Sequence, residues 1–252
     1  MATISVIIIT KNEEEDIRRC LETVKWADEI IVLDANSSDQ TRSICLEYTD
    51  NVFNTDWPGF GRQKNRALDK ATQEWILSID ADEVLSDALI VEIQNVLKFN
   101  PQGLMAYRIR RVSNYCGKFI RYGAWRNDKP LRLFKNNIAR FDDRVIHESL
   151  QLLANTKVGL LKNSMRHYSY RNLSEVLQKL NHYSTDSARL RFDKGQRANM
   201  PIVLLKTTWN FLKGYILELG FMDGREGFLL AVSNAMGVFY RYTKLIYLQK
   251  QK

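Results

Sequence analysis

Apolar, strand-like runs alternate with helix-like segments through the first hundred residues, and this alternation limits the folds open to the chain. The runs are rich in β-branched residues and lie at 3–10, 30–33, 51–55 and 75–80. Amphipathic segments separate them, with Ile17, Leu21 and Val24 on one face of the first. Parallel strands need helical crossovers of this kind. We therefore predict an α/β fold with a Rossmann-like, mostly parallel sheet that carries helices on both faces.

The pattern changes after about residue 100. Residues 104–170 are strand-like but irregular, and the chain after residue 172 is helical. We expect a catalytic domain at 1–170 and a helical extension at 171–252. Pro201 suits the first turn of the second C-terminal helix, whose apolar residues repeat at helical spacing. The apolar run of the last helix, about fourteen residues, is short of the roughly 20 that span a bilayer, so no transmembrane helix is expected.

Composition sets further limits. Three cysteines without CxxC spacing favour a reducing compartment over a disulfide framework or a zinc site. The start of the chain has no basic segment before its apolar run, so we do not expect a signal peptide. The net charge of +8 is uneven, with 10 Lys and Arg against 19 Asp and Glu in residues 1–100, and 27 against 10 in residues 101–252. An anionic substrate, an anionic membrane surface or a solvated face would each explain the basic part.

Three carboxylates follow the strand at 75–80 directly. Asp80 and Asp82 form a DxD element, and Glu83 comes next. An unpaired carboxylate at the end of a buried strand is costly, but a divalent cation that also binds a diphosphate would neutralise two of them. We therefore predict that Asp80 and Asp82 bind Mn²⁺ or Mg²⁺. The alternative is that Asp82 or Glu83 only caps the next helix.

Other polar residues stand at the expected carboxyl ends of strands, where parallel sheets bind ligands. Thr10 ends the first strand, and Asp34 ends the second before a Ser- and Asn-rich turn. Asn12 stands where the N-cap of the first helix is expected. Lys64 belongs to a glycine-containing basic segment, 59–68, that would lead as a loop into a helix and hold phosphate. An Asx-turn at Asp34 and a flexible basic loop are the structural alternatives.

These segments resemble the family 2 inverting glycosyltransferases with the GT-A fold. The matching segments are SVIIITKNEE, EIIVLDANSSDQT, GRQKNRAL and WILSIDADE. The resemblance is closer to the branch of lipopolysaccharide inner-core glucosyltransferases, bacterial enzymes with segments similar to its RLF (132–134), its VIHES (145–149) and the pair His167-Tyr168. Members often carry a second acid or a glycine where this chain has Ala35 and Asn36.

The resemblance implies roles for individual residues. The uridine site would be lined by Thr10, Asn12 and Asp34, with Lys64 near the base or the phosphates. Asp80 would lie near the ribose or the metal, and Asp82 would bind the metal. Glu148 would be the general base, with Asp142 and Asp143 as rivals. Arg132 is a candidate contact for the leaving group or the acceptor, as is Trp125.

The implied reaction moves a hexose, expected to be glucose, from a UDP-sugar to a lipopolysaccharide core or a related cell-surface glycan. A cytoplasmic enzyme would meet both substrates at the inner face of the bacterial inner membrane. A lipid-linked, phosphate-bearing acceptor would account for part of the basic half. The C-terminal helices would contact this acceptor, a membrane surface or a second subunit in a homodimer.

Two other classes fit parts of the sequence. DADEV matches the motif of Mg²⁺-dependent haloacid-dehalogenase-like phosphatases, but a complete strand–helix array of some seventy residues precedes it. The basic half alone would suit a nucleic-acid-binding module. That interpretation leaves Asp34, Asp80 and Asp82 without a purpose, so no nucleic-acid partner is expected.

Overall fold

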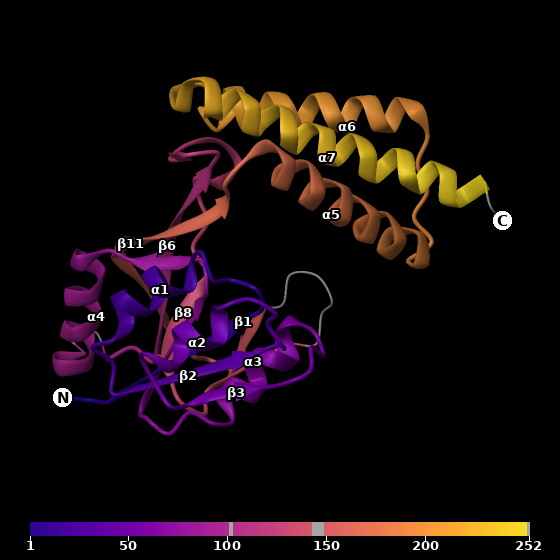
Figure 1. Ribbon diagram of the computed structural model, residues 1–252. Coiled ribbons are helices and arrows are strands. Elements are labelled where there is room, and N and C mark those ends of the chain that lie inside the picture. Colours follow the sequence, from indigo (N-terminus) through magenta and orange to yellow (C-terminus); the bar gives the residue numbers. More distant parts are fainter. Residues whose placement is uncertain (101–102, 143–148, 251–252) are drawn as a thin grey trace. The chain divides into compact units, whose positions relative to one another are not determined.

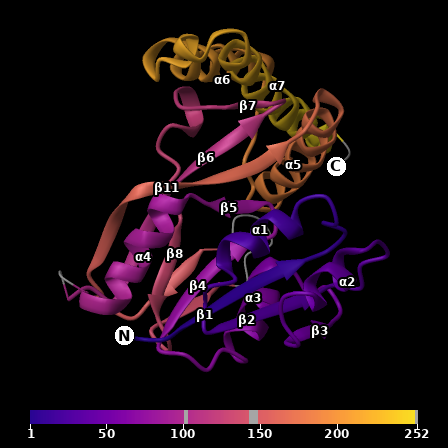
Figure 2. The ribbon, with the colours of Figure 1, turned by 60° about the vertical axis from the view of Figure 1, so that its left-hand side comes forward.

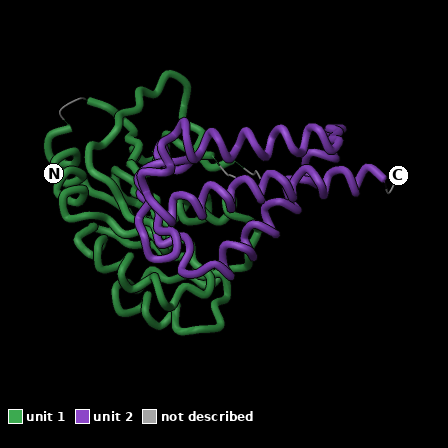
Figure 3. Tube along the Cα trace, turned by 90° about the horizontal axis from the view of Figure 1, so that it is seen from above, with its two compact units in different colours: residues 1–111, 128–167 green, residues 112–127, 168–252 purple. Residues whose placement is uncertain are grey.

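The computed structural model describes residues 1–100, 103–142 and 149–250 of the chain (Figure 1). The chain forms two compact units, coloured separately in Figure 3. Unit 1 consists of residues 1–111 and 128–167, and unit 2 of residues 112–127 and 168–252. The predicted boundary at residue 170 stays a prediction, and the units are described separately below.

Unit 1 contains the parallel part of the sheet. Its strands are β1 (Ile4–Thr10), β2 (Glu29–Asp34), β3 (Val52–Asn54) and β4 (Trp75–Asp80). They lie in the order β3-β2-β1-β4, and all three pairings are parallel. β1 is buried along its whole length, which explains its near-continuous run of valine and isoleucine.

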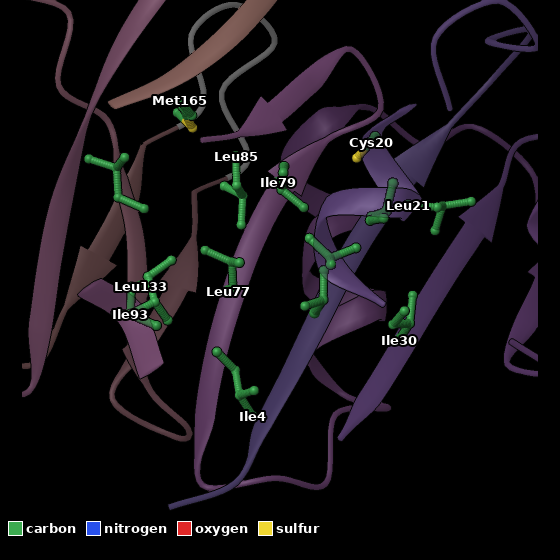
Figure 4. Close-up of a cluster of buried hydrophobic side chains, with 14 of the residues drawn as sticks. Ile4, Cys20, Leu21, Ile30, Leu77, Ile79, Leu85, Ile93, Leu133 and Met165 are labelled. Carbon is green, nitrogen blue, oxygen red and sulfur yellow. The ribbon is translucent and has the colours of Figure 1, made fainter. Parts of the chain in front are cut away.

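Helices cover both faces of this parallel part. They are α1 (Ile17–Val24), α2 (Thr41–Leu46), α3 (Phe60–Leu68) and α4 (Asp87–Phe99). Because side chains alternate along a strand, Ile4 and Ile8 of β1 join the cluster that contains α1, α2 and α4 (Figure 4). Ile7 and Ile9 join a second cluster with Ala67 of α3. The α/β class with helices on both faces is therefore confirmed.

The other strands make the sheet mixed. They are β5 (Glu83–Leu85), β6 (Ala106–Tyr115), β7 (Lys118–Phe119), β8 (Leu131–Lys135) and β11 (Val158–Tyr170). β8 pairs antiparallel with β4, and β11 pairs antiparallel with β5. Within the described residues the sheet has nine strands, and β9 (Ala139–Phe141) and β10 (Leu150–Leu152) form a separate antiparallel pair.

Unit 2 is mainly helical. It contains α5 (Leu173–Asp193), α6 (Met200–Leu212) and α7 (Gly224–Lys250), and both α5 and α6 pack against α7. A π-helical turn, η2 (Lys213–Leu217), and a 3-10 turn, η3 (Gly220–Asp223), join α6 to α7. A further 3-10 turn, η1, covers Gly123–Trp125. In the part of the chain described, no helix is long and apolar enough to span a bilayer.

Two local expectations were wrong. Asn12 does not cap α1, whose N-cap is Asp16, and the Asn12 backbone is left-handed, with φ 55°. The segment predicted as a basic loop is helical from Phe60, because Gly59 at φ 107° supplies the backbone turn before the helix.

Candidate active site

The parallel strands bring three of the predicted site residues to one edge of the sheet. Thr10 pairs with Asp34 across β1 and β2, and Ile9 pairs with Asp80 across β1 and β4. Figure 2 shows β1 between these two strands. The backbone positions of Thr10, Asp34 and Asp80 are therefore fixed by the sheet register at its carboxyl edge, as ligand sites of this fold class require.

Asp80 is held between two cations. Lys64 Nζ lies 2.9 Å from Asp80 Oδ1, and the guanidinium of Arg132 donates a hydrogen bond to Asp80 Oδ2. Burial raises the pKa of the Asp80 carboxyl, but the charges of Arg132 and Lys64 outweigh this effect and hold the pKa well below its usual range. Asp80 is therefore ionised at neutral pH. Its two cationic partners, Lys64 and Arg132, are both buried.

Glu83 forms hydrogen bonds with two arginines of the site. It is fully buried, and its Oε1 accepts hydrogen bonds from Arg132 Nη2 at 2.6 Å and from Arg111 Nη1 at 2.9 Å. Its Oε2 accepts the backbone N–H of Asp80 at 2.9 Å. Arg111 Nε in turn donates to Asp128 Oδ2 at 2.7 Å. Glu83 thus positions both the backbone and the cationic partner of Asp80, and does not simply cap a helix.

Asp82 lies in a different environment. Its Oδ2 lies 3.1 Å from Nε2 of His167, and both side chains are partly exposed, at 21% and 17%. The pairing of β11 with β5 places His167 opposite Glu83, next to Asp82. This contact depends on the pairing of two strands that are some eighty residues apart in the sequence. Asp82 and His167 therefore offer an oxygen and a nitrogen that could act as ligand atoms, on side chains that solvent reaches.

The loops after β1 and β2 are tied to each other. Asp34 is buried and accepts hydrogen bonds from the backbone N–H of Ser37 at 3.0 Å and from its hydroxyl at 2.5 Å. Ser37 Oγ accepts the backbone N–H of Asn12 at 2.8 Å, and Asn12 Oδ1 accepts the backbone N–H of Ser38 at 2.8 Å. The Asp34 side chain thus accepts from the residue three positions on, which is not the spacing of the alternative Asx-turn, and Ser37 links Asp34 to Asn12.

Thr10 adds a buried donor at this edge. Its Oγ1 is buried and has no hydrogen-bond partner among the described residues. A buried hydroxyl without a partner costs free energy, so such groups call for an explanation. The predicted role of Thr10 offers such an explanation, because its hydroxyl would form a hydrogen bond with a polar ligand bound at this edge of the sheet.

The cluster around Asp80 joins acidic and basic side chains. Asp80, Glu83 and Asp128 contact Lys64, Arg111 and Arg132, and Asp82 contacts His167. The described residues contain no group of three or more His, Cys, Asp and Glu side chains that could hold a metal ion by themselves. Mg²⁺ and Mn²⁺ commonly use one or two carboxylates and take their other ligands from substrate phosphates and water. The partly exposed carboxylate of Asp82 fits this habit, and His167 adds an imidazole nitrogen beside it.

Some predicted residues cannot be placed. Glu148 and Asp143 lie outside the described residues. Asp142 Oδ1 accepts the backbone N–H of Ser149 at 3.0 Å, and its Oδ2 accepts the Ser149 hydroxyl at 2.8 Å. Trp125 belongs to unit 2, where it stacks on Tyr170 with ring centroids 5.9 Å apart. The choice of base therefore stays a prediction.

Sequence comparison identifies the class of protein. The family model "Glycosyl transferase family 2" matches residues 5–153, more than half of the chain. A protein of Rickettsia typhi described as an uncharacterized glycosyltransferase is 31% identical over 254 residues, covering 97% of this chain and 87% of its own length. The chain belongs to glycosyl transferase family 2 and is a glycosyltransferase. This assignment decides against the phosphatase and the nucleic-acid-binding module.

The chain is also similar to one further curated protein and to parts of solved structures. The lipopolysaccharide core biosynthesis glycosyltransferase LpsC of Rhizobium meliloti is 27% identical over 251 residues, covering 96% of this chain and 91% of its own. Among solved structures, Staphylococcus aureus TarS residues 1–349 gives a TM-score of 0.49 at 15% identity, covering 99% of this chain and 92% of that chain. Glucosyl-3-phosphoglycerate synthase of Mycobacterium tuberculosis, crystallised with Mn²⁺ and UDP-glucose, gives 0.37 at 23% identity over 45% of this chain and 44% of that chain.

Proposed function

We propose that the chain transfers a hexose, expected to be glucose, from a UDP-sugar to a lipopolysaccharide core or a related cell-surface glycan, with inversion at the sugar carbon. Membership of glycosyl transferase family 2 and the similarity to LpsC over nearly the whole chain support the class of acceptor. The observation that carries the proposal is the cluster of ionised groups at the carboxyl edge of β1, β2 and β4.

In this proposal the donor nucleotide lies against the linked loops after β1 and β2. The buried carboxylate of Asp34 would accept a hydrogen bond from the uracil, while Asn12 holds the loop that carries Ser37. The unpartnered hydroxyl of Thr10 would find a polar partner in the nucleotide. Each of these groups is held in place by the sheet or by another loop, so little ordering cost remains for binding.

The diphosphate would lie near Asp80 and Asp82. Asp82 and His167 would hold a divalent cation, and Asp80, kept ionised by Lys64 and Arg132, adds negative charge close by. A divalent cation, when bound, stabilises the negative charge that develops on a departing diphosphate. Both carboxylate oxygens of Asp80 have cationic partners, so Asp82 is the better placed of the two aspartates to bind a metal directly.

The transfer itself needs a base. The acceptor hydroxyl forms a bond to the sugar C1 as the bond between C1 and the phosphate oxygen breaks, and UDP leaves. The hydroxyl proton passes to a carboxylate, for which Glu148 is our candidate; a base of this kind contributes about 10²–10⁴ in rate. A single displacement inverts the sugar carbon and needs no covalent intermediate. A nucleotide-sugar donor would place the reaction in the cytoplasm.

A screen of nucleotide-sugars by thermal shift, with and without Mn²⁺, tests the proposal. UDP-sugars are expected to raise the melting temperature only with the metal, and Asp82→Ala should lose this response. Glu148→Gln should keep the response but lose transfer to purified core lipopolysaccharide by at least about a hundredfold. Asp87→Ala, an exposed acid at the start of α4, is the matched control and should behave as the wild type.

The outcomes separate the parts of the proposal. If no nucleotide-sugar gives a metal-dependent shift, the donor site is wrong. If Glu148→Gln transfers sugar at the normal rate, only the choice of base is wrong.

A further inference from the structure

α6 exposes an apolar face. Leu205, Trp209 and Leu212 recur at helical spacing, and their side chains are 72%, 57% and 38% exposed. Val203 is the only residue of this helix that is fully buried. The exposed apolar side chains continue through η2 and η3 as Ile216, Leu217, Phe221 and Met222. We call the set from Leu205 to Met222 the apolar stripe.

The stretch of chain around the stripe has more cations than acids. Residues 194–223 include Lys194, Arg197, Lys206 and Lys213 against Glu218 and Asp223, and Lys213 Nζ lies 3.6 Å from Glu218 Oε1. Unit 2 as a whole carries 16 Lys and Arg against 6 Asp and Glu. A large exposed apolar surface next to an excess of positive charge is typical of protein surfaces that bind anionic membranes.

A second feature of unit 2 is a cluster of cations around the ring of Tyr242, which we call the cationic cluster. The Arg191 guanidinium lies 5.2 Å from the centroid of this ring, and Lys206 Nζ lies 5.5 Å from it. Arg241 is close enough to Arg191 for the two charges to repel, and burial together with this repulsion lowers the pKa of Arg241. The three residues come from α5, α6 and α7.

The cationic cluster has no anionic partner in the described part of the chain. None of Arg191, Lys206 and Arg241 forms an ion pair with a described carboxylate. Nε of Arg191 and Nε of Arg241 are both buried without a hydrogen-bond partner among these residues. Arg191 Nη1 donates to the neutral side chain of Gln196 at 2.6 Å. Like charges held together without a counter-charge favour the binding of an anion.

We propose that unit 2 docks on the surface of an anionic lipid bilayer. The apolar stripe would enter the interface, with Trp209 at the level of the head groups, and the cationic cluster would bind lipid phosphates. Lys206 joins the two features, because it follows Leu205 on α6 and belongs to the cluster. This proposal concerns unit 2 alone and does not depend on the identity of the sugar donor.

Charge favours a membrane over a second copy of the chain. A symmetric dimer through the stripe would bring the same surface of two subunits together, and so would oppose cations to cations. With its net positive charge, unit 2 offers few carboxylates to compensate them. A bilayer rich in anionic lipids supplies both an apolar interior and negative charge.

Co-sedimentation of the full chain with vesicles tests this directly. The chain should bind vesicles of phosphatidylethanolamine and phosphatidylglycerol, in a ratio of roughly 7:3, and should not bind phosphatidylcholine vesicles. Binding should weaken between about 0.1 M and about 0.5 M salt, because salt screens the attraction of the cations. This comparison needs no variant and so does not depend on the folding of one.

Two double variants separate the features. Leu205→Asp with Trp209→Ser should weaken binding at least about tenfold. Arg191→Gln with Arg241→Gln should weaken it by about fivefold for each charge removed. Val91→Ser, which removes an exposed apolar side chain from α4 in unit 1, is the control and should leave binding unchanged. Circular dichroism establishes that each variant is folded.

Three results would overturn the proposal. The first is a wild-type chain that does not bind the anionic vesicles. The second is binding that both double variants retain in full. The third is a stable dimer that Leu205→Asp dissociates, without vesicle binding, because it would assign the stripe to a second copy of the chain.

Discussion

At the scale of single residues, Arg132 is buried and lies between a fully buried carboxylate, Glu83, and a partly exposed one, Asp80. One of its nitrogens donates to both Asp80 and Glu83, and Glu83 is completely buried. Removing one member of a buried ion pair leaves a charge without compensation, which typically costs about 3–5 kcal/mol. Arg111 still contacts Glu83, and Lys64 still contacts Asp80, so the lower end of that range applies.

We therefore predict that Arg132→Met lowers the free energy of unfolding by about 3 kcal/mol. Arg110→Met makes the same change at an exposed position of β6, and should cost less than about 0.5 kcal/mol. Urea unfolding at pH 7 in EDTA measures both. Equal losses in the two variants would contradict the buried charge network.

The pH dependence of the same variant follows from the lowered pKa of Asp80. A lowered folded-state pKa contributes stability that is complete above the unfolded value of about 3.9 and is lost as the pH falls through the folded value. With Arg132 replaced, the pKa of Asp80 should rise, so its contribution to stability becomes smaller. In EDTA, the acid unfolding of Arg132→Met should begin at a higher pH than that of the wild type.

The sequence indicated only part of this residue network. Asp34, Asp80 and Asp82 could be found because each follows an apolar strand directly. Arg111, Asp128 and His167 could not be matched to them, because their contacts depend on the antiparallel pairings of β8, β6, β11 and β5. Glu83 stands out in the sequence as an acid just after a strand. Its neighbours in the sequence do not indicate that it is buried or that it contacts two arginines.

At the scale of elements, α7 makes a very close contact with the preceding turn. A Cβ on Gly227 would lie 2.0 Å from the carbonyl oxygen of Gly220 and 2.9 Å from the Cβ of Asp223. Such a separation cannot exist, so any side chain at Gly227 would force η3 away from α7. Gly237, also in α7, would place its Cβ 4.0 Å from Leu180, which is an ordinary contact.

Replacing each of these two glycines of α7 by alanine should therefore change the stability of the chain in different directions. Gly227→Ala should destabilise the chain by about 1–3 kcal/mol or more, because backbone must move. Gly237→Ala should be neutral or stabilise by up to about 1 kcal/mol, because alanine favours the helix. Thermal unfolding followed by circular dichroism compares the two. A tolerated Gly227→Ala would show that η3 does not pack against α7 as described.

Elements were easier to predict from sequence than the faces they bury. The strands β1 to β4 and the helices α1, α2 and α4 follow the apolar pattern, within a few residues at their ends, whereas β5 was not predicted. The stripe of Leu205, Trp209 and Leu212 was also correctly seen as one face of a helix, but a pattern of spacing cannot tell whether that face meets protein or solvent. The start of α3 was missed because its basic and polar residues have no apolar period.

At the scale of the whole molecule, the charge imbalance divides differently between units than between halves of the sequence. Unit 1 carries 21 Lys and Arg against 23 Asp and Glu, and unit 2 carries the remaining excess of cations. The arginines at 108–111 and Arg132 belong to unit 1, where Arg111 and Arg132 neutralise acids of the candidate site. The basic character that needs an external partner is therefore concentrated in unit 2.

The central proposal is that a divalent cation and the diphosphate of a nucleotide-sugar bind at the carboxyl edge of β1, β2 and β4. Crystals of the full chain grown with UDP and Mn²⁺ would test it through the anomalous signal of manganese. We predict a peak within about 2.3 Å of an Asp82 carboxylate oxygen, with the diphosphate beside it and the uracil near Asp34. Two results would contradict the account. Manganese and UDP could both bind elsewhere, or UDP could bind at this edge while manganese makes no contact with Asp82.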